Sequence, residues 1–330
     1  MNLPVSYEDI FGVKKHNFNE TALEIFHFQA TQNAVYAEFL DRIDVKPTEV
    51  RSVDQIPYLP IDFFKTRVVK SGSWQHTVDH RFESSSTTGK NTSKHYYHDL
   101  DWYTRSFTNC FKQFYGPPTD WCILALLPNY LERNNSGLIE MANSLIQQSQ
   151  NPDSGFYLYE HEALLNQIEH NEQKGIKTLL LGVSFALLDF AERVRPGFKH
   201  LTVMETGGMK GRRKEIIRLE LHRLLQKGFG SIPIHSEYGM TELFSQAYSM
   251  GDQLFSTPNW MEVRIKQLDD PFSDAAQGKN GLIHVIDLAN IQTCSFIATA
   301  DIGRLHKDGR FEVLGRFDHS EQRGCNLLLS

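Results

Sequence analysis

The sequence predicts an α/β protein with large, mostly parallel sheets flanked by helices and a β-rich C-terminal lobe. Between residues 121 and 239, short apolar runs alternate with amphipathic stretches. This alternation is typical of βαβ units, whose parallel sheet is covered by helices on both faces. After about residue 255, strand-like segments follow one another through Gly and Asp turns without intervening helices. We therefore expect an α/β core over residues 1–254 and a β-rich lobe over residues 255–330.

The individual elements follow from local patterns along the chain. Residues 19–42 carry apolar residues at helical spacing behind an Asn/Thr start and predict one long amphipathic helix. Residues 56–69 are rich in proline and aromatics and predict a loop leading into an edge strand. Further strands are predicted at 121–128, 155–159, 177–182, 200–208, 231–239, 260–268, 281–289, 294–303 and 310–317. Helices are predicted at 137–148, from the end of the 155–159 strand through residue 171, at 183–194 and at 212–228.

Composition excludes several functional classes. The 330 residues are 40% hydrophobic and carry a net charge of -6, so nothing favours nucleic acid as the main partner. No apolar run reaches the roughly 18–20 residues that a membrane span requires. The N-terminus lacks the layout of a signal peptide, so we expect a cytoplasmic protein. Its four cysteines form no CxxC pair, which argues against a structural zinc site.

A hydroxyl-rich loop is the first candidate for binding chemistry. The stretch HRFESSSTTGKNTSKHYY, residues 80–97, combines serines and threonines with a glycine and two lysines. Backbone N–H groups in such turns form an anion nest, and lysines add charge toward phosphate oxygens. A solvated polar loop is the alternative interpretation. The Walker pattern is excluded because Ser84 and Asn91 occupy positions that need Gly and Ser or Thr.

Three further segments occur after this loop in a fixed order. They are SEYGMTEL (236–243), ATADIGRL (298–305) and EVLGRFDHSEQRGC (312–325). With the SSSTTG loop, they resemble the core motifs of the adenylate-forming enzymes in order and approximate spacing. The chain most closely resembles the acyl-protein synthetase branch, the fatty-acid-activating component of bacterial bioluminescence reductases. The resemblance covers the chain from about residue 56 to its end, and four motifs in register are far more specific than one.

The resemblance implies a binding site for ATP. The loop residues implied to contact the phosphates are Ser85, Thr87, Thr88 and Gly89, with either Lys90 or Lys94 as the phosphate lysine. This loop departs from the family pattern at Ser86, where a glycine is usual. The residues implied to surround adenine are Gly207 and Gly208, which allow a close backbone approach, and Tyr238 with Gly239, the aromatic turn that stacks on the ring.

The same resemblance implies the residues around the ribose and the α-phosphate. Thr241 matches the hydroxyl near the α-phosphate, and Glu242 matches the carboxylate that holds Mg²⁺. Asp301 matches the acid that binds the ribose hydroxyls, with Ala300 where many members have glycine. Arg316 matches the arginine near ribose and phosphate. The acyl pocket is expected near the strand ends, around residues 126–132 and 181–188.

The implied reaction is ATP-dependent activation of a carboxylic acid to an acyl-adenylate, with acyl transfer to a thiol. Family members commonly carry a further small domain after the GR motif, whereas this sequence ends at Ser330, so we expect that domain to be largely missing. In the acyl-protein synthetase branch, a C-terminal cysteine accepts the acyl group before a reductase partner receives it. Cys325 matches that residue by position, and a thiolate is a good nucleophile toward an acyl-adenylate.

Other functions remain open from the sequence. An acyl- or aryl-CoA ligase would use coenzyme A in place of the protein thiol. A non-catalytic nucleotide-binding subunit would bind ATP without forming an adenylate. The segment LLLGVSFA (179–186) also resembles a nucleophile elbow, which would make Ser184 a hydrolase nucleophile with Asp287 and His306. The HTVDH segment (76–80) is rejected as a metalloprotease site because Thr77 replaces the required glutamate.

Overall fold

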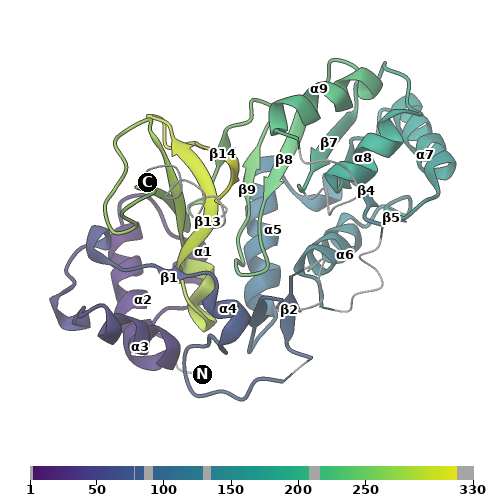
Figure 1. Ribbon diagram of the computed structural model, residues 1–330. Helices are drawn as coiled ribbons and strands as arrows, with labels where there is room; N and C mark the ends of the chain where they lie inside the picture. The colour runs from purple at the N-terminus through teal and green to yellow at the C-terminus, as the bar shows by residue number, and fades with distance from the viewer. Residues whose placement is uncertain (1–2, 78, 85–91, 129–134, 208–215, 318–330) are drawn as a thin grey trace.

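The computed structural model describes residues 3–77, 79–84, 92–128, 135–207 and 216–317. Five described strands form the parallel part of its main sheet, in the order β8-β7-β6-β4-β5 (Figure 1). Their bounds are β4 Cys122–Leu126, β5 Gly155–Tyr157, β6 Thr178–Gly182, β7 Leu201–Glu205 and β8 Ile234–Tyr238. Every residue of β4 and β6 is buried, as expected for central strands covered on both faces.

The antiparallel strands extend the same sheet beyond β8. They continue in the order β9-β10-β14-β13-β12-β11, and β1 pairs with β13 in parallel. Their bounds are β1 Leu59–Pro60, β9 Ala247–Ser249, β10 Phe255–Ser256, β11 Met261–Lys266, β12 Asn280–Asp287, β13 Phe296–Leu305 and β14 Phe311–Arg316. A separate hairpin pairs β2 (Arg81–Glu83) with β3 (Lys94–Tyr96). The predicted α/β class is confirmed, and the division at residue 254 stays a prediction.

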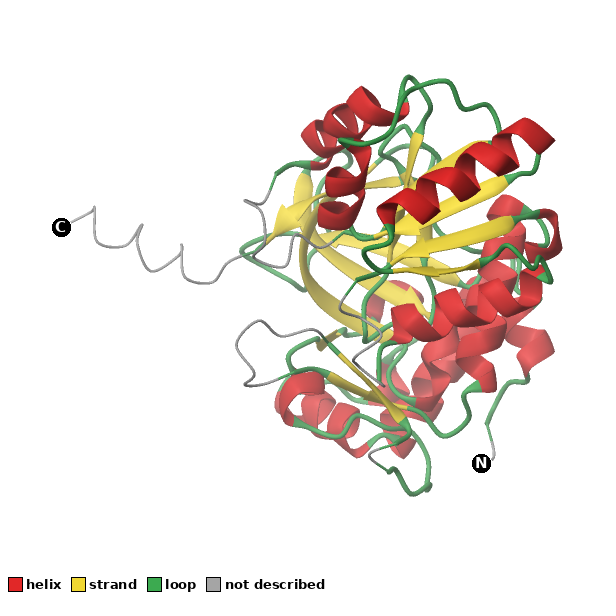
Figure 2. Ribbon diagram, turned by 90° about the vertical axis from the view of Figure 1, so that its right-hand side faces the viewer, coloured by secondary structure: helices red, strands yellow, loops and turns green. Residues whose placement is uncertain are grey.

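Helices lie on both sides of the parallel strands (Figure 2). Their bounds are α5 Asp101–Tyr115, α6 Gly137–Ser149, α7 His161–Lys174, α8 Ser184–Ala191 and α9 Arg218–Phe229. On one face, His222 Nε2 of α9 lies 3.1 Å from the hydroxyl of Ser236 in β8. On the other face, the Tyr115 hydroxyl of α5 lies 3.1 Å from His235 Nδ1. Alternate residues of β8 therefore face α9 and α5 in turn.

The N-terminal segment packs helices against the antiparallel strands (Figure 1). Its helices are α1 Tyr7–Phe11, α2 Phe18–Gln32, α3 Ala34–Arg42 and α4 Phe63–Thr66. The prediction of a single helix over 19–42 was wrong, because Asn33 adopts extended backbone between α2 and α3. Its side-chain oxygen accepts hydrogen bonds from Val35 N (3.1 Å) and Tyr36 N (3.0 Å). Asn33 is therefore the N-cap of a new helix. The 3₁₀ turns are η1 Pro47–Glu49, η2 Val53–Gln55, η3 Pro118–Asp120 and η4 Leu288–Gln292.

Helix α5 is the longest of the described elements that the sequence patterns did not predict. It buries apolar residues along its length: Trp102 packs against Tyr7 of α1, and Tyr115 contacts His235 of β8 and Tyr248 of β9. Helix α9 begins at Arg218, later than the predicted residue 212, and residues 208–215 lie outside the described ranges. Of the helices in the described ranges, none is both long and apolar enough to cross a lipid bilayer.

Candidate active site

The segments singled out around residues 205–207, 238–242 and 301–316 meet at the carboxyl end of the parallel strands. Strand β7 ends at Glu205 and leads to Gly207, and β8 leads directly into residues 238–242. The antiparallel strands β13 and β14 bring Asp301 and Arg316 to the same place. In open α/β sheets, this edge is where ligands bind.

Tyr238 and Asp301 are joined although 63 positions separate them in the sequence. The Tyr238 hydroxyl donates to Asp301 Oδ2 over 2.8 Å, and its ring packs edge-on against Phe255 and Phe311. Asp301 lies directly across the β13–β14 ladder from Arg316. Burial raises the pKa of Asp301, while the Tyr238 hydrogen bond and the charge of Arg316 oppose that rise. Tyr238, Asp301 and Arg316, three of the residues predicted to surround the nucleotide, therefore form one cluster.

Glu242 is a nearly buried carboxyl on the segment that follows β8. Its side chain hydrogen-bonds Ser93, and the positive charges of Arg316 and Lys65 act on it. Burial nevertheless raises its pKa, with these contacts opposing the rise. Asn290 Nδ2 donates to the Glu242 backbone carbonyl over 2.8 Å and fixes its backbone. Thr241 precedes it and is partly exposed.

Asp287 positions the chain just after Glu242. It is fully buried, and its carboxylate accepts from Phe244 N (3.0 Å), Ser245 N (2.8 Å) and the Ser245 hydroxyl (2.6 Å). Burial raises the pKa of Asp287 to about 6, and these hydrogen bonds oppose the rise. The carboxylate thus holds the 242–245 segment against the end of β12.

His95 connects the strand after the hydroxyl loop to the Thr241–Glu242 segment. The Thr241 carbonyl can only accept, so His95 Nδ1–H donates to it over 2.8 Å, and Nε2 accepts from the Thr293 hydroxyl over 2.9 Å. Burial lowers the pKa of His95 to about 4, so the ring is neutral at pH 7. Strand alternation points Ser93 and His95 one way and Lys94 the other. The choice between Lys90 and Lys94 stays a prediction.

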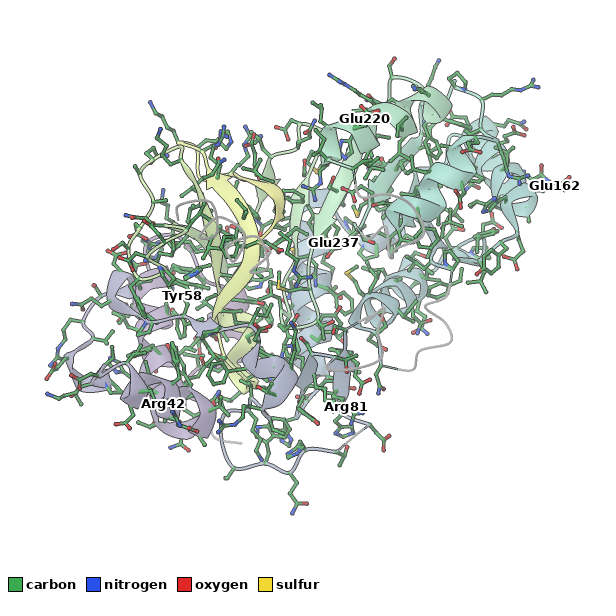
Figure 3. All side chains as sticks on the ribbon, in the orientation of Figure 1. Arg42, Tyr58, Arg81, Glu162, Glu220 and Glu237 are labelled. Carbon is green, nitrogen blue, oxygen red and sulfur yellow. The ribbon has the colours of Figure 1, made fainter. Side chains whose placement is uncertain are left out.

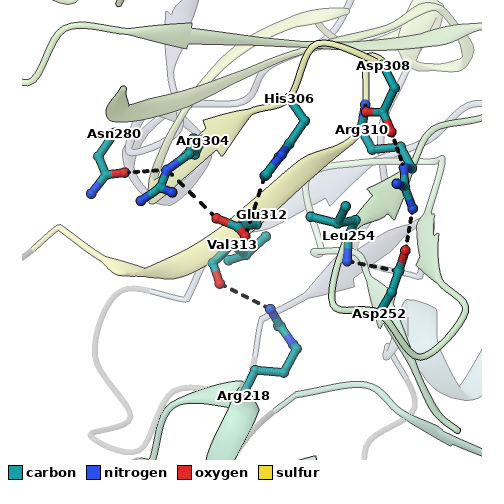
Figure 4. A network of polar contacts seen from close by, with 10 residues as sticks. All are labelled: Arg218, Asp252, Leu254, Asn280, Arg304, His306, Asp308, Arg310, Glu312 and Val313. Carbon is teal, nitrogen blue, oxygen red and sulfur yellow. Dashed lines mark hydrogen bonds and ion pairs between the residues drawn. The ribbon is translucent and has the colours of Figure 1, made fainter. Parts of the chain in front are cut away.

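Glu205 organises the Gly207 turn. Its carboxylate accepts from Gly207 N (2.7 Å) and from Arg218 Nε (3.0 Å). Gly207 has a φ of 70°, a conformation that favours glycine. Arg218 Nη1 also donates to the Val313 carbonyl over 3.2 Å, so α9 is tied to β14 (Figure 4). Burial opposes ionisation of Glu205, but the contacts with His222 and Arg218 outweigh it and lower the pKa to about 2.

Several predicted residues fall where the structure gives no description. Those outside the described ranges are Ser85, Thr87, Thr88, Gly89, Lys90, Gly208 and Cys325. Gly239 is exposed in the turn after Tyr238, and a Cβ there would lie only 2.2 Å from Glu237 Oε1. Sequence reasoning missed His95, Glu205, Arg218 and Asn290, and it considered Asp287 only for a hydrolase role. Their contacts link distant segments and leave no local pattern to detect.

The hydrolase interpretation is wrong, because its three residues do not meet. Ser184 is buried, and its hydroxyl donates to Glu205 Oε2 over 3.3 Å. The Asp287 carboxylate accepts hydrogen bonds from the amides of residues 244 and 245 and from the Ser245 hydroxyl. His306 lies on the β13–β14 hairpin, with its Nε2 3.4 Å from Glu312 (Figure 4). No histidine therefore activates Ser184 among the contacts of the described residues.

A comparison with protein families gives one match over nearly the whole chain. The family described as "Acyl-protein synthetase, LuxE" matches residues 3–330. The chain belongs to the acyl-protein synthetase (LuxE) family. This membership confirms the resemblance predicted from the motifs. A comparison with curated proteins finds no match.

Solved structures share the fold of this LuxE-family chain. ATP-bound MatB from Rhodopseudomonas palustris matches with a TM-score of 0.53 and 16% identity, over 72% of this chain and 47% of MatB. MenE, the o-succinylbenzoate CoA synthetase from Bacillus subtilis, matches with a TM-score of 0.50 and 19% identity, over 72% and 48%. The chain therefore spans about half the length of these relatives. A 2-hydroxyisobutyryl-CoA ligase matches with a TM-score of 0.64 and 11% identity, over 96% and 70%.

Proposed function

We propose that this chain activates a carboxylic acid with ATP, forming an acyl-adenylate and pyrophosphate, and then transfers the acyl group to a thiol. The observation that carries the proposal is the meeting of Tyr238, Asp301 and Arg316 with the Thr241–Glu242 segment at one sheet edge. These are the positions that the family resemblance implies for ATP. Membership in the LuxE family and the ATP-bound state of MatB support it.

The chemistry requires two anions to approach each other. The substrate carboxylate attacks the α-phosphorus, and the bond from that phosphorus to the pyrophosphate oxygen breaks, so pyrophosphate leaves. A carboxylic acid is already ionised at pH 7, and no general base is needed. Positioning and charge neutralisation supply the rate enhancement. Arg316 and Lys65, whose charges reach Glu242, are the described cations suited to this role.

Glu242 fits the role of a magnesium ligand. Mg²⁺ binds proteins through one or two carboxylates and completes its octahedron with phosphates and water. Glu242 supplies one such buried carboxylate, and no group of three or more ligating side chains occurs in the part of the chain described. When bound, Mg²⁺ would neutralise phosphate charge. Ser93 and Asn290 would hold the carboxylate and its backbone in place.

Pyrophosphate release tests the first half-reaction. The purified chain, incubated with ATP, Mg²⁺ and a series of carboxylic acids, is expected to release pyrophosphate only when an acid is present. Fatty acids are the first choice, because the family resemblance implies a fatty acyl substrate. ATP binding without acid-dependent pyrophosphate release would instead identify a non-catalytic nucleotide-binding subunit. We place the reaction in the cytoplasm, where ATP is available.

Cys325 is proposed as the thiol that accepts the acyl group, before a reductase or carrier protein receives it. The Cys325→Ser variant should keep wild-type pyrophosphate release and lose covalent labelling by radioactive fatty acid. Wild-type label should be released by hydroxylamine, since a thioester is labile to it. Cys110→Ser is the matched control, because burial raises the pKa of that thiol well above its ordinary value. Undiminished labelling of Cys325→Ser would remove this residue from the reaction.

Coenzyme A is the second candidate acceptor. The 2-hydroxyisobutyryl-CoA ligase structure holds 2-HIB-AMP and CoA, and MenE is a CoA synthetase. These likenesses favour an acyl- or aryl-CoA ligase as the alternative. Adding coenzyme A to the labelled reaction separates the two functions. A CoA ligase would form a small-molecule thioester that does not depend on Cys325.

A further inference from the structure

Glu237 is a buried carboxyl that the proposed reaction does not use. The residue is only 8% exposed and lies centrally, where β8 meets the antiparallel strands (Figure 3). Strand alternation directs it toward α5, away from Ser236 and Tyr238. Within the described ranges, no group hydrogen-bonds or ion-pairs with this carboxyl. Buried polar groups of native proteins ordinarily have partners, so an unpartnered carboxyl here points to a ligand.

The protonation state of Glu237 determines whether its carboxyl can donate a hydrogen bond. Burial and, less strongly, the charge of Glu205 raise its pKa to about 8, so at pH 7 the carboxyl is mostly neutral and can donate a hydrogen bond. In the unfolded chain the same group ionises near its ordinary pKa. Between about pH 4.5 and pH 8, the folded state therefore keeps this proton while the unfolded chain has lost it. The free energy of unfolding consequently falls as pH rises through that range. Glu237 thus destabilises the free protein at neutral pH.

A second unsatisfied group lies beside Gly239, as Glu237 does. Gln246 Oε1 is buried and has no hydrogen-bond partner, while its Nε2 reaches the Phe244 carbonyl over 3.4 Å. Both side chains lie against Gly239. A Cβ at Gly239 would be 2.2 Å from Glu237 Oε1 and 3.5 Å from Gln246 Cγ. Helix α5 closes this face, with Cys110 Sγ donating to the Gln246 carbonyl over 3.2 Å.

These two groups have a definite chemical complement. Neutral Glu237 supplies a donor, and Gln246 Oε1 supplies an acceptor. A hydroxyl both accepts and donates, so it satisfies the two groups at once, whereas a methylene satisfies neither. Gly239, against which both lie, is two residues before Thr241, the residue implied to lie near the α-phosphate. A hydroxyl bound here would be close to the reacting carboxylate.

We propose that Glu237 and Gln246 bind a hydroxyl carried by the acyl substrate near its carboxylate, and so select hydroxy acids over unsubstituted acids of equal length. This inference rests on the proposed acid-activating function and adds a substrate class to it. A site built to hydrogen-bond a hydroxyl discriminates against the analogue without it, because its own buried groups are then left unpaired. Glu237 and Gln246 are thereby specificity-determining residues.

The test compares acids of one chain length, unsubstituted and hydroxylated at carbon 2 or 3, by pyrophosphate release. For the wild type, we expect kcat/KM for one hydroxy acid to exceed that of the unsubstituted acid by about 10-fold or more. Glu237→Leu should bring this ratio close to 1, mainly through slower use of the hydroxy acid, and Gln246→Leu should lower it. Glu237→Gln keeps a donor in a side chain of similar shape and should retain most of the preference.

The possible outcomes separate this inference from the proposed function. If all acids are activated and the ratio is the same in wild type and Glu237→Leu, acid activation holds and the hydroxyl site is overturned. If no acid in either series releases pyrophosphate, the proposed function fails, and the inference falls with it. A Glu237-dependent preference for 2-amino acids would also overturn it, because the carboxyl would then be pairing with an ammonium group. Calorimetric titration with ATP shows whether each variant retains the nucleotide site.

Discussion

Replacing Glu242 with alanine is expected to lower the rate of adenylate formation by about 10³-fold. The residue supplies a buried carboxylate beside Ser93, and the positive charges of Arg316 and Lys65 act on it. In the proposed reaction, this carboxylate holds Mg²⁺ next to the phosphates. Exchange of labelled pyrophosphate into ATP, dependent on the acid, measures this half-reaction directly. Glu242→Gln should be impaired as well, because an amide carries no charge, and its residual exchange should require more Mg²⁺.

Stability measurements show whether the Glu242 effect is chemical. Burial raises the pKa of Glu242, so the folded state gains nothing from its ionisation, and removing the carboxyl should leave the unfolding midpoint near the wild-type value. The matched control is Glu162→Ala on α7, an exposed glutamate far from the sheet edge (Figure 3). It should keep full exchange activity. Near-normal exchange in Glu242→Ala would show that this carboxylate does not serve the reaction.

The sequence predicted those parts of the fold that have a local cause. Strands β4 and β6 appear as continuous apolar runs because both faces are covered, and the structure buries all of their residues. The break at Asn33 was missed, since apolar spacing continues through it and only the capping geometry marks the new helix. Helix α5 was missed although Tyr103, Phe107 and Phe111 recur at every fourth position, because polar residues interleave with its aromatics.

The residues of the candidate site also differ in whether the sequence alone could reveal them. The Tyr238–Glu242 turn and Asp301 are parts of short motifs, so they could be selected from the sequence alone. The groups that position them could not be. The Asp287 carboxylate reaches the amides of residues 244 and 245, and His95 reaches the Thr241 carbonyl 146 positions away. Such contacts exist only after the strands pair, so a single sequence carries no periodic or spacing signal for them.

Glu205→Gln is expected to reduce the free energy of unfolding at pH 7 by about 3 kcal/mol, the equivalent of a pKa lowered from 4.5 to about 2. A group whose pKa is depressed by folding stabilises the protein above its unfolded pKa and loses that effect as pH falls. The difference between wild type and variant, measured by urea unfolding, should therefore be full at pH 7. It should shrink as pH falls from about 4.5 toward 2, where wild-type Glu205 also loses its charge.

The physical reason lies in what the glutamine leaves unpaired. Arg218 would keep its charge in a partly buried position without the carboxylate 3.0 Å from its Nε, and loss of one partner of such a pair is costly. Glu38→Gln is the matched control, since Glu38 also pairs with two arginines but on the exposed surface, and it should change stability little. Equal effects of the two substitutions would mean that burial does not strengthen the Glu205 pair. Because Glu205 also accepts from Gly207 N, the variant should bind ATP more weakly at temperatures where it is still folded.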